Sequence, residues 1–158
     1  MKTNWQTKRF LITGIPGMGK TTIGNYLQKE HSFIHVDMES GVNISLSDIL
    51  DLEKDVVITW GFVPNDEQIS TVHLLKDNGF KLLWLDGNKE AAEREFIKRD
   101  SKLGPAYLQA QKEALKLQLE RIKASDVITR IQPKIINTFD SRHQFKKLQE
   151  IVEEIENA

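Results

Sequence analysis

A glycine-rich stretch near the N-terminus carries residue types that bind phosphate. It reads Gly14-Ile15-Pro16-Gly17-Met18-Gly19-Lys20-Thr21, the spacing G-x-x-x-x-G-K-T, with Thr22 next in the chain. The glycines let the backbone turn tightly and aim successive N–H groups at an anion, and a helix opening near Gly19 adds the positive end of its dipole. Lys20 can neutralise the β- and γ-phosphates, and the Thr21 hydroxyl can ligate Mg²⁺. Thr22 can touch the α-phosphate or be an ordinary helix residue. The stretch predicts a nucleotide site over residues 14–22, and a glycine-rich turn with an incidental lysine is the alternative.

Two acidic residues follow the next apolar run. Asp37 and Glu39 stand two apart at the end of an extended segment, so both can face the γ-phosphate. We expect Asp37 to join Thr21 in the Mg²⁺ shell and to accept the proton of an acceptor hydroxyl, and Glu39 to orient that acceptor. Solvated turn residues are the alternative.

A layered α/β fold is needed to position these residues. Apolar, β-branched and aromatic runs predict strands at residues 8–13, 32–36, 55–59, 80–85 and 134–139. Helices are expected at residues 19–30, 45–52, 66–77, 88–99, 106–125 and 141–156. Because the strand runs are nearly continuous, both faces of each strand should be covered. We therefore predict an α/β three-layer fold, with a five-stranded, mostly parallel sheet and helices on both faces.

The whole-chain properties limit the alternatives. A length of 158 residues suits one domain, and 39% hydrophobic with 28% charged residues is typical of a soluble globular protein. Without cysteine there can be no disulfide or thiolate site, and a formal charge of −1 gives no general field for nucleic acid or membrane. The first residues lack the apolar region of a signal peptide, so a cytoplasmic location is expected. The four histidines, at 31, 35, 73 and 143, lack metal-ligand spacing and are expected to be structural or surface residues.

The segment GIPGMGKTT and the β/α order after it resemble the small-molecule kinase branch of the P-loop proteins, which includes shikimate kinase, gluconate kinase and adenylate-kinase-like proteins. The resemblance extends over most of the chain and is specific at the P-loop. It implies a single kinase-like domain over residues 1–158 that binds ATP, or GTP in its place, and Mg²⁺. In that branch a D-x-D pair often stands where this chain has Asp37-Met38-Glu39.

The same resemblance implies a short lid around residues 100–106. Arginines before or within such a lid contact the nucleotide or the transferring phosphate, which makes Arg99, and less so Arg94, a catalytic candidate. A helix-end arginine favoured by the helix dipole is the alternative. Residues 137–141 fall where related folds form part of the base pocket.

Departures from the family pattern bear on the acceptor. Residues 56–62 contain no Walker B acid, and Gly61 stands between Trp60 and Phe62, aromatics that could floor an acceptor pocket or simply pack in the core. No arginine occurs between Arg9 and Arg94, although bidentate guanidinium groups are the usual way to bind carboxylate or phosphate. The interval 38–54 is too short for a large acceptor domain. A small neutral or hydroxyl-bearing acceptor is favoured, or an anion held by lysine.

The leading hypothesis is an ATP-dependent phosphotransferase that moves the γ-phosphate to a hydroxyl of a small metabolite. A nucleotide-binding regulatory or degenerate kinase-like module without efficient transfer is the second hypothesis, motivated by the missing Walker B acid and acceptor arginines. The third is an NTPase, or a kinase of nucleosides or nucleic-acid ends, although the acidic balance counts against nucleic acid. No membrane partner is expected, and the sequence leaves the oligomeric state open.

Overall fold

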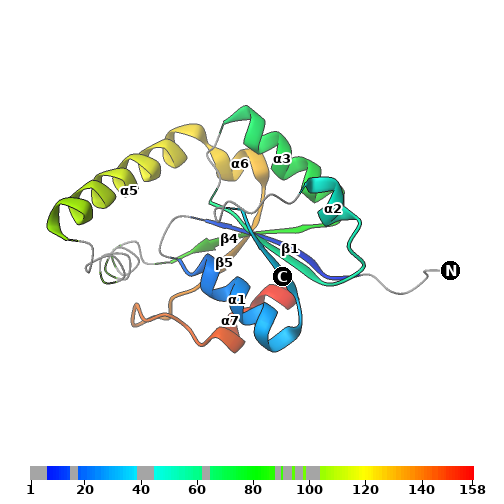
Figure 1. Ribbon diagram of the computed structural model, residues 1–158. Coiled ribbons are helices and arrows are strands. Elements are labelled where there is room, and N and C mark those ends of the chain that lie inside the picture. The colour runs from blue at the N-terminus through cyan, green and yellow to red at the C-terminus, as the bar shows by residue number, and fades with distance from the viewer. Residues whose placement is uncertain are drawn as a thin grey trace.

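Five parallel strands form one sheet. In chain order they are β1 (Arg9–Gly14), β2 (Ile34–Asp37), β3 (Val56–Thr59), β4 (Lys81–Asp86) and β5 (Lys134–Asn137). The computed structural model, shown in Figure 1, describes residues 7–14, 18–38, 45–61, 65–87 and 104–158, together with Glu90, Arg94 and Lys98. Within that part of the chain the strand order is β2-β3-β1-β4-β5, and each pairing is parallel. The predicted five-stranded α/β sheet is confirmed.

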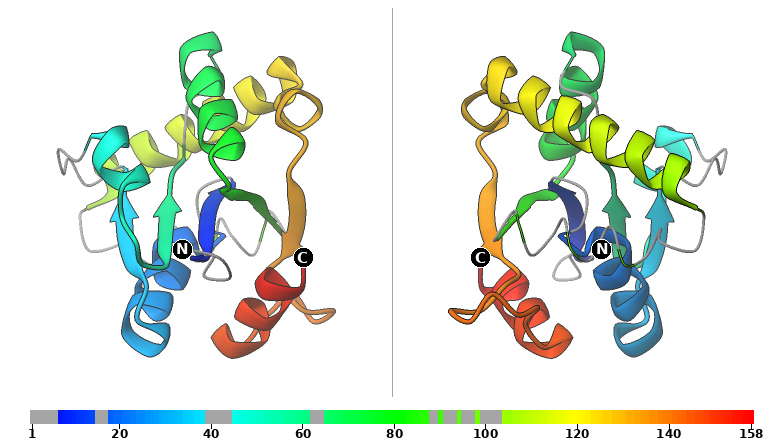
Figure 2. Two further views of the ribbon diagram at one scale, coloured as in Figure 1. Left: turned by 90° about the vertical axis from the view of Figure 1, so that its right-hand side faces the viewer. Right: turned by 90° about the vertical axis from the view of Figure 1, so that its left-hand side faces the viewer.

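Helices cover both faces of this sheet, which confirms the three layers. The first helix, α1 (Lys20–His31), and the last, α7 (Leu148–Asn157), pack together on one face. The other face carries α2 (Leu46–Leu50), α3 (Asp66–Asp77), α5 (Pro105–Ser125) and α6 (Val127–Ile131), as Figures 1 and 2 show. None of the described helices is both long enough and apolar enough to cross a membrane.

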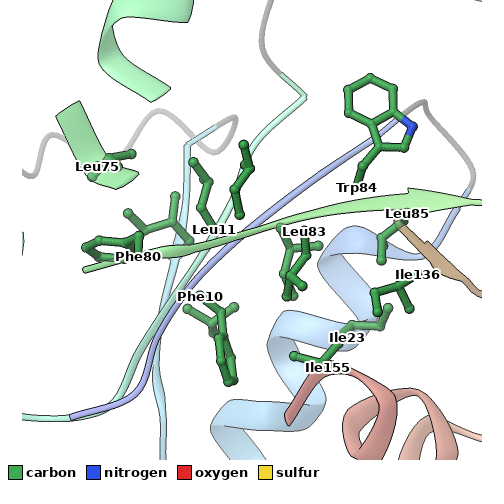
Figure 3. Close-up of a cluster of buried hydrophobic side chains, with 14 of the residues drawn as sticks. Phe10, Leu11, Ile23, Leu75, Phe80, Leu83, Trp84, Leu85, Ile136 and Ile155 are labelled. Carbon is green, nitrogen blue, oxygen red and sulfur yellow. The ribbon is translucent and has the colours of Figure 1, made fainter. Parts of the chain in front are cut away.

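The core lies on both sides of the sheet, and this explains the continuous apolar runs. All four residues of β3 are buried, as are the last five of β1. Figure 3 shows Ile23 and Ile155 from α1 and α7 on one side of β4, and Leu75 from α3 on the other. Helix α5 also contributes to the core, because Leu115 is buried and Leu119 packs against the core residues.

Two features of the C-terminal third differ from the prediction. The last helix begins at Leu148 rather than at residue 141, because residues 138–147 form a short hairpin closed by an antiparallel bridge between Phe139 and Phe145. The Asp140 carboxylate accepts the backbone N–H groups of Arg142 and Gln144 at 2.8 Å and 3.0 Å, which stabilises a turn in place of a helix. The short helix α6 was not predicted, although its apolar residues Val127 and Ile131 stand at the i, i+4 spacing of a helical face.

The helix predicted at residues 88–99 falls mostly outside the described residues. Within it, Glu90, Arg94 and Lys98 are helical and exposed. The predicted helix at residues 66–77 ends at Asp77 as expected, and Gly79 follows it with a φ of 90°, a conformation that glycine adopts readily at the end of a helix.

Candidate functional site

The ends of the phosphate-loop motif are held by β1 and α1. The strand ends at Gly14, whose φ is 136°, and the helix starts after Gly19, whose φ is 98°. Both values lie in the region that favours glycine, and at Gly14 a side chain would also stand 2.7 Å from the carbonyl oxygen of Leu85. Met18 is fully buried, which fixes the loop to the core on its C-terminal side. The strand and the helix that the motif requires are therefore both present, while Ile15, Pro16 and Gly17 lie outside the described residues.

The Lys20 side chain connects the two ends of this loop, from the start of α1 to the end of β1. Its Nζ donates to the carbonyl oxygen of Gly14 at 3.1 Å, so the charge lies beside the end of β1 and not in open solvent. The first turn of α1 has no acidic side chain, and its residues Thr21 and Thr22 are exposed. The backbone N–H groups in the first turn of a helix, together with a nearby ammonium group, form a favourable site for binding an anion.

Asp37 ends β2 beside β3, where its Cα is in register with that of Thr59. The carboxylate-bearing residue is half-buried, and its side chain points to the face that α1 covers, since side chains at His35 and Asp37 share one face of the strand. Glu39, the second acidic candidate, lies outside the described residues.

A histidine joins α1 to the two strands just below Asp37. His35 Nδ1 lies 2.9 Å from Asn25 Oδ1 of α1, and Nε2 lies 2.7 Å from Thr59 Oγ1 of β3. Burial lowers the pKa of His35, and the Asp37 carboxylate opposes that effect in part. The sequence predicts a structural or surface role for His35, and no local pattern indicates the parts that Thr59 and Asn25 have in this contact.

The helix comes unusually close to the strand at this point. A side chain at Gly24 would lie 2.6 Å from Cε1 of the His35 ring, so only glycine permits the observed approach. A glycine inside a helix costs about 1 kcal/mol relative to alanine, and its presence in the middle of α1 was the one sequence signal of this contact.

The periodicities of α1 and β2 put Thr21 and Asp37 at one level. Thr21 stands one helical turn before Asn25, and Asp37 stands two residues after His35. One turn rises about 6 Å over four residues of helix, and two residues of strand rise about 6.6 Å. Helix α1 runs antiparallel to β2. The Thr21 hydroxyl and the Asp37 carboxylate therefore both lie nearer the phosphate loop than the Asn25–His35 pair, by one helical turn and by two strand residues respectively. Both are oxygen ligands, the type that Mg²⁺ takes in nucleotide sites, so these residues fit that metal.

The end of β3 carries Trp60 and Gly61 in place of an acid. The backbone N–H of Trp60 donates to the carbonyl oxygen of Ile12 at 2.9 Å, which extends the pairing of β3 with β1. The Trp60 ring is partly buried against the core. Core packing, one of the two roles predicted for Trp60, is thus present, and Phe62 lies outside the described residues.

The hairpin at residues 138–147 reaches the phosphate loop from the far end of the chain. Phe145 packs against Gly19 so closely that a Cβ added at Gly19 would lie 2.7 Å from Cε2 of the Phe145 ring. The same ring packs edge-on against Phe139, with the ring centroids 5.6 Å apart. The Thr138 N–H donates to the carbonyl oxygen of Asp86 at 2.9 Å and ties the hairpin to the end of β4. The segment predicted to help form a base pocket thus belongs to a hairpin that contacts the last glycine of the motif.

Of the predicted lid around residues 100–106, the structure describes only residues 104–106. Arg99 and residues 100–103 lie outside the described residues. Gly104 has a φ of 97°, and Pro105 starts α5 at the position where its missing N–H costs least.

Comparison with known proteins supports the fold. No protein-family model matches the sequence, and no curated protein matches it significantly. Among solved structures, shikimate kinase from Bacteroides thetaiotaomicron is similar, with a TM-score of 0.58, 18% identity, and coverage of 95% of this chain and 97% of that chain. A gluconokinase from Sinorhizobium meliloti has a TM-score of 0.57 at 16% identity, over 93% of this chain and 88% of that one.

A fungal RNA kinase is similar as well, with a TM-score of 0.56 at 16% identity, over 95% of this chain and 84% of the other. The chain therefore has the P-loop kinase-like fold, and the acceptors of these three proteins differ.

Proposed function

We propose that this protein is an ATP- and Mg²⁺-dependent kinase that transfers the γ-phosphoryl group to a hydroxyl of a small metabolite. The observation that carries the proposal is the grouping of Lys20, Thr21 and Asp37 at one end of the sheet. Lys20 Nζ lies 3.1 Å from the carbonyl oxygen of Gly14, and the periodicities of α1 and β2 bring the other two residues to the same level beside the loop. The likeness of the fold to several kinases supports the same class of reaction.

Bound ATP and Mg²⁺ would supply the phosphoryl group and the charge that polarises it. The loop N–H groups and the Lys20 ammonium would hold the phosphates and offset the charge that develops on the leaving oxygen. Thr21 and Asp37 would hold the metal, and Asp37 would take the proton from the acceptor hydroxyl. Glu39 would orient the acceptor, and Arg99 would add positive charge from the lid side.

The arginine distribution favours a neutral acceptor. Arg9 is the one arginine in the first 93 residues, and both ends of its guanidinium are engaged. It donates to the carbonyl oxygens of Asn78 at 2.9 Å and Leu50 at 2.8 Å and lies over the Phe80 ring. These partners are at the opposite end of β1 from the phosphate loop. A sugar or other polyhydroxylated molecule therefore suits the site better than a carboxylate or phosphate that needs a guanidinium fork.

The second candidate is a nucleotide-binding module without efficient transfer. It is favoured by one observation, the sequence Thr59-Trp60-Gly61 at the end of β3, where many P-loop enzymes have an acid that holds the metal through water.

The test is Mg²⁺-dependent ATP turnover with a panel of sugars, sugar acids, nucleosides and small alcohols, beside a control without acceptor. One acceptor should raise turnover well above the control. Lys20→Ala should abolish that turnover and weaken nucleotide binding, whereas Lys29→Ala, an exposed lysine in the last turn of the same helix, should do neither. Tight nucleotide binding that no acceptor stimulates would favour the module.

Asp37→Asn separates transfer from binding. The amide keeps the shape of the side chain but is a poor base and a poor metal ligand, so acceptor-dependent turnover should stop while nucleotide binding persists. Asp77→Asn, an exposed residue at the end of α3, is the matched control and should leave turnover unchanged. Full activity of Asp37→Asn would exclude Asp37 as the base.

A further inference from the structure

His35 occupies the junction of the three elements that carry the proposed site. Its ring nitrogens lie 2.9 Å from Asn25 Oδ1 on α1 and 2.7 Å from Thr59 Oγ1 on β3, and its backbone belongs to β2. The ring rests on Gly24, which lets the helix approach to contact distance. Thr59 is 1% exposed, so the histidine is the partner of a hydroxyl that water barely reaches.

The bonding pattern defines one neutral form of the ring. With the Asn25 carboxamide oxygen facing Nδ1, that nitrogen carries the hydrogen and donates it. Nε2 then accepts from the Thr59 hydroxyl. Each of the three groups thus has one role, and a ring bonded at both nitrogens cannot rotate without breaking a hydrogen bond.

We propose that His35 is a positioning residue that sets the separation of Thr21 from Asp37 by holding α1 at a fixed distance from the ends of β2 and β3. The inference rests on the proposed function, because it concerns the two residues that would hold the metal. Its basis is the geometry: the Asn25–His35 pair lies one helical turn below Thr21 and two strand residues below Asp37.

The physical reason is preorganisation. A carboxylate and a hydroxyl that must act on the same phosphate group lose rate steeply when they are displaced, and a shift of 1 Å can cost about 100-fold. Thr59 is in register with Asp37 and paired to it across the strands, so fixing the Thr59 side chain to His35 also fixes the neighbour of Asp37. His35 would act through these contacts and not on the substrate itself.

Thr59→Val is the discriminating variant, because valine keeps the shape and the β-branching of threonine and removes only the hydroxyl. Thr59→Ser restores the hydroxyl. Thr13→Val is the matched control: Thr13 is a fully buried threonine of β1 whose hydroxyl donates to the carbonyl oxygen of Leu83 at 2.9 Å, on the opposite face of the sheet. It removes one buried hydrogen bond without touching His35.

Two readouts are needed. The first is kcat and the KM for ATP at saturating acceptor. The second is hydrogen exchange at the Met38 amide, which donates to the carbonyl oxygen of Thr59 at 3.0 Å and reports how firmly the end of β2 is held, whether or not nucleotide is present.

Thr59→Val should lower kcat by at least about 10-fold, with the KM for ATP within about threefold of wild type, and should speed exchange at Met38. Thr59→Ser should stay near wild type in both readouts. Thr13→Val should lower the melting temperature as Thr59→Val does and leave kcat and Met38 exchange unchanged.

The proposal is overturned if Thr59→Val behaves as Thr13→Val does in both readouts, since the hydroxyl would then serve stability alone. If the wild-type protein shows no acceptor-stimulated turnover, the proposed function fails, and Met38 exchange decides the positioning role by itself. Unchanged exchange in Thr59→Val would then refute it, and faster exchange in that variant alone would support it.

Discussion

Gly24→Ala should destabilise this protein, although the same change stabilises most helices. Alanine in a helix interior is favoured over glycine by about 1 kcal/mol. At this position the new Cβ would lie 2.6 Å from Cε1 and 2.7 Å from Cδ2 of His35, distances that real Cβ contacts do not show. Either the ring or the helix must move.

The size of the effect follows from what holds the ring. Moving it lengthens the hydrogen bonds at 2.9 Å to Asn25 and 2.7 Å to Thr59, each worth about 1 kcal/mol. Holding it in place instead overpacks the interface, at a cost of about 1–3 kcal/mol. After subtracting the gain in helix propensity of about 1 kcal/mol, the net loss should be about 1 kcal/mol and at most about 2 kcal/mol, and each kcal/mol lowers the melting temperature by about 2–4 °C.

A double-mutant cycle with His35→Ala isolates this contact. Removing the ring opens the space, so Gly24→Ala should then stabilise by about 1 kcal/mol, and the coupling between the two sites should be about 2–3 kcal/mol. Urea unfolding followed by circular dichroism measures all four proteins. Gly79→Ala is the control, because Gly79 has a φ of 90° and open space around it, so its cost should not depend on His35. If Gly24→Ala stabilises both backgrounds equally, the close approach of α1 to β2 is refuted.

Three further predictions concern the loop, the histidine and the hairpin. Gly19→Ala combines a φ of 98° with a contact to Phe145, so nucleotide affinity and stability should both fall, and Phe145→Ala should recover only part of the stability, as thermal unfolding with and without nucleotide would reveal. Burial lowers the pKa of His35 below its value of 6.5 in the unfolded chain, so the unfolded state binds more protons in that window. Its contribution to stability should be complete above about pH 6.5 and decline as the pH falls toward the lowered pKa, and urea unfolding across that range should show a steeper loss in wild type than in His35→Gln. Asp140→Ala should speed amide exchange at Gln144, whose N–H donates to that carboxylate at 3.0 Å, and unchanged exchange would mean that the turn does not depend on it.

The parts of the fold that follow from local pattern were predictable. Val56–Thr59 is apolar up to a terminal threonine and is buried along its whole length, as expected of a strand between two layers of helices. The start of the last helix was not predictable in this way. Residues 141–147 are mostly polar, as on the exposed face of a helix, so their pattern does not exclude one. They are not helical in the structure, where Phe145 packs instead on Gly19, more than a hundred residues earlier in the chain. Such a contact depends on the tertiary fold and has no local signature.

The candidate site also has features that follow from local sequence pattern and features that depend on tertiary contacts. The spacing of glycines, lysine and threonine is local, so the motif and its strand–loop–helix context could be predicted from the sequence, as could the position of Asp37 at the end of a strand. The connection among Asn25, His35 and Thr59 could not, since each residue is ordinary by itself and the three lie on different elements.

Gly24 is the exception, because a glycine in the middle of a helix lowers helix stability without any local benefit. Its cost is offset only if something must approach the helix there, and the residue that does so, His35, is the one that connects the helix to both strands. If Gly24 served only to make room for a ring, any apolar ring of similar size could replace the imidazole at position 35. His35→Phe would preserve that packing while losing both hydrogen bonds. If the packing were sufficient, this variant should keep kcat; if the hydrogen bonds position Asp37, it should fold and lose kcat as Thr59→Val does. The effect of His35→Phe on kcat therefore distinguishes a ring that only packs against Gly24 from a ring whose hydrogen bonds position Asp37.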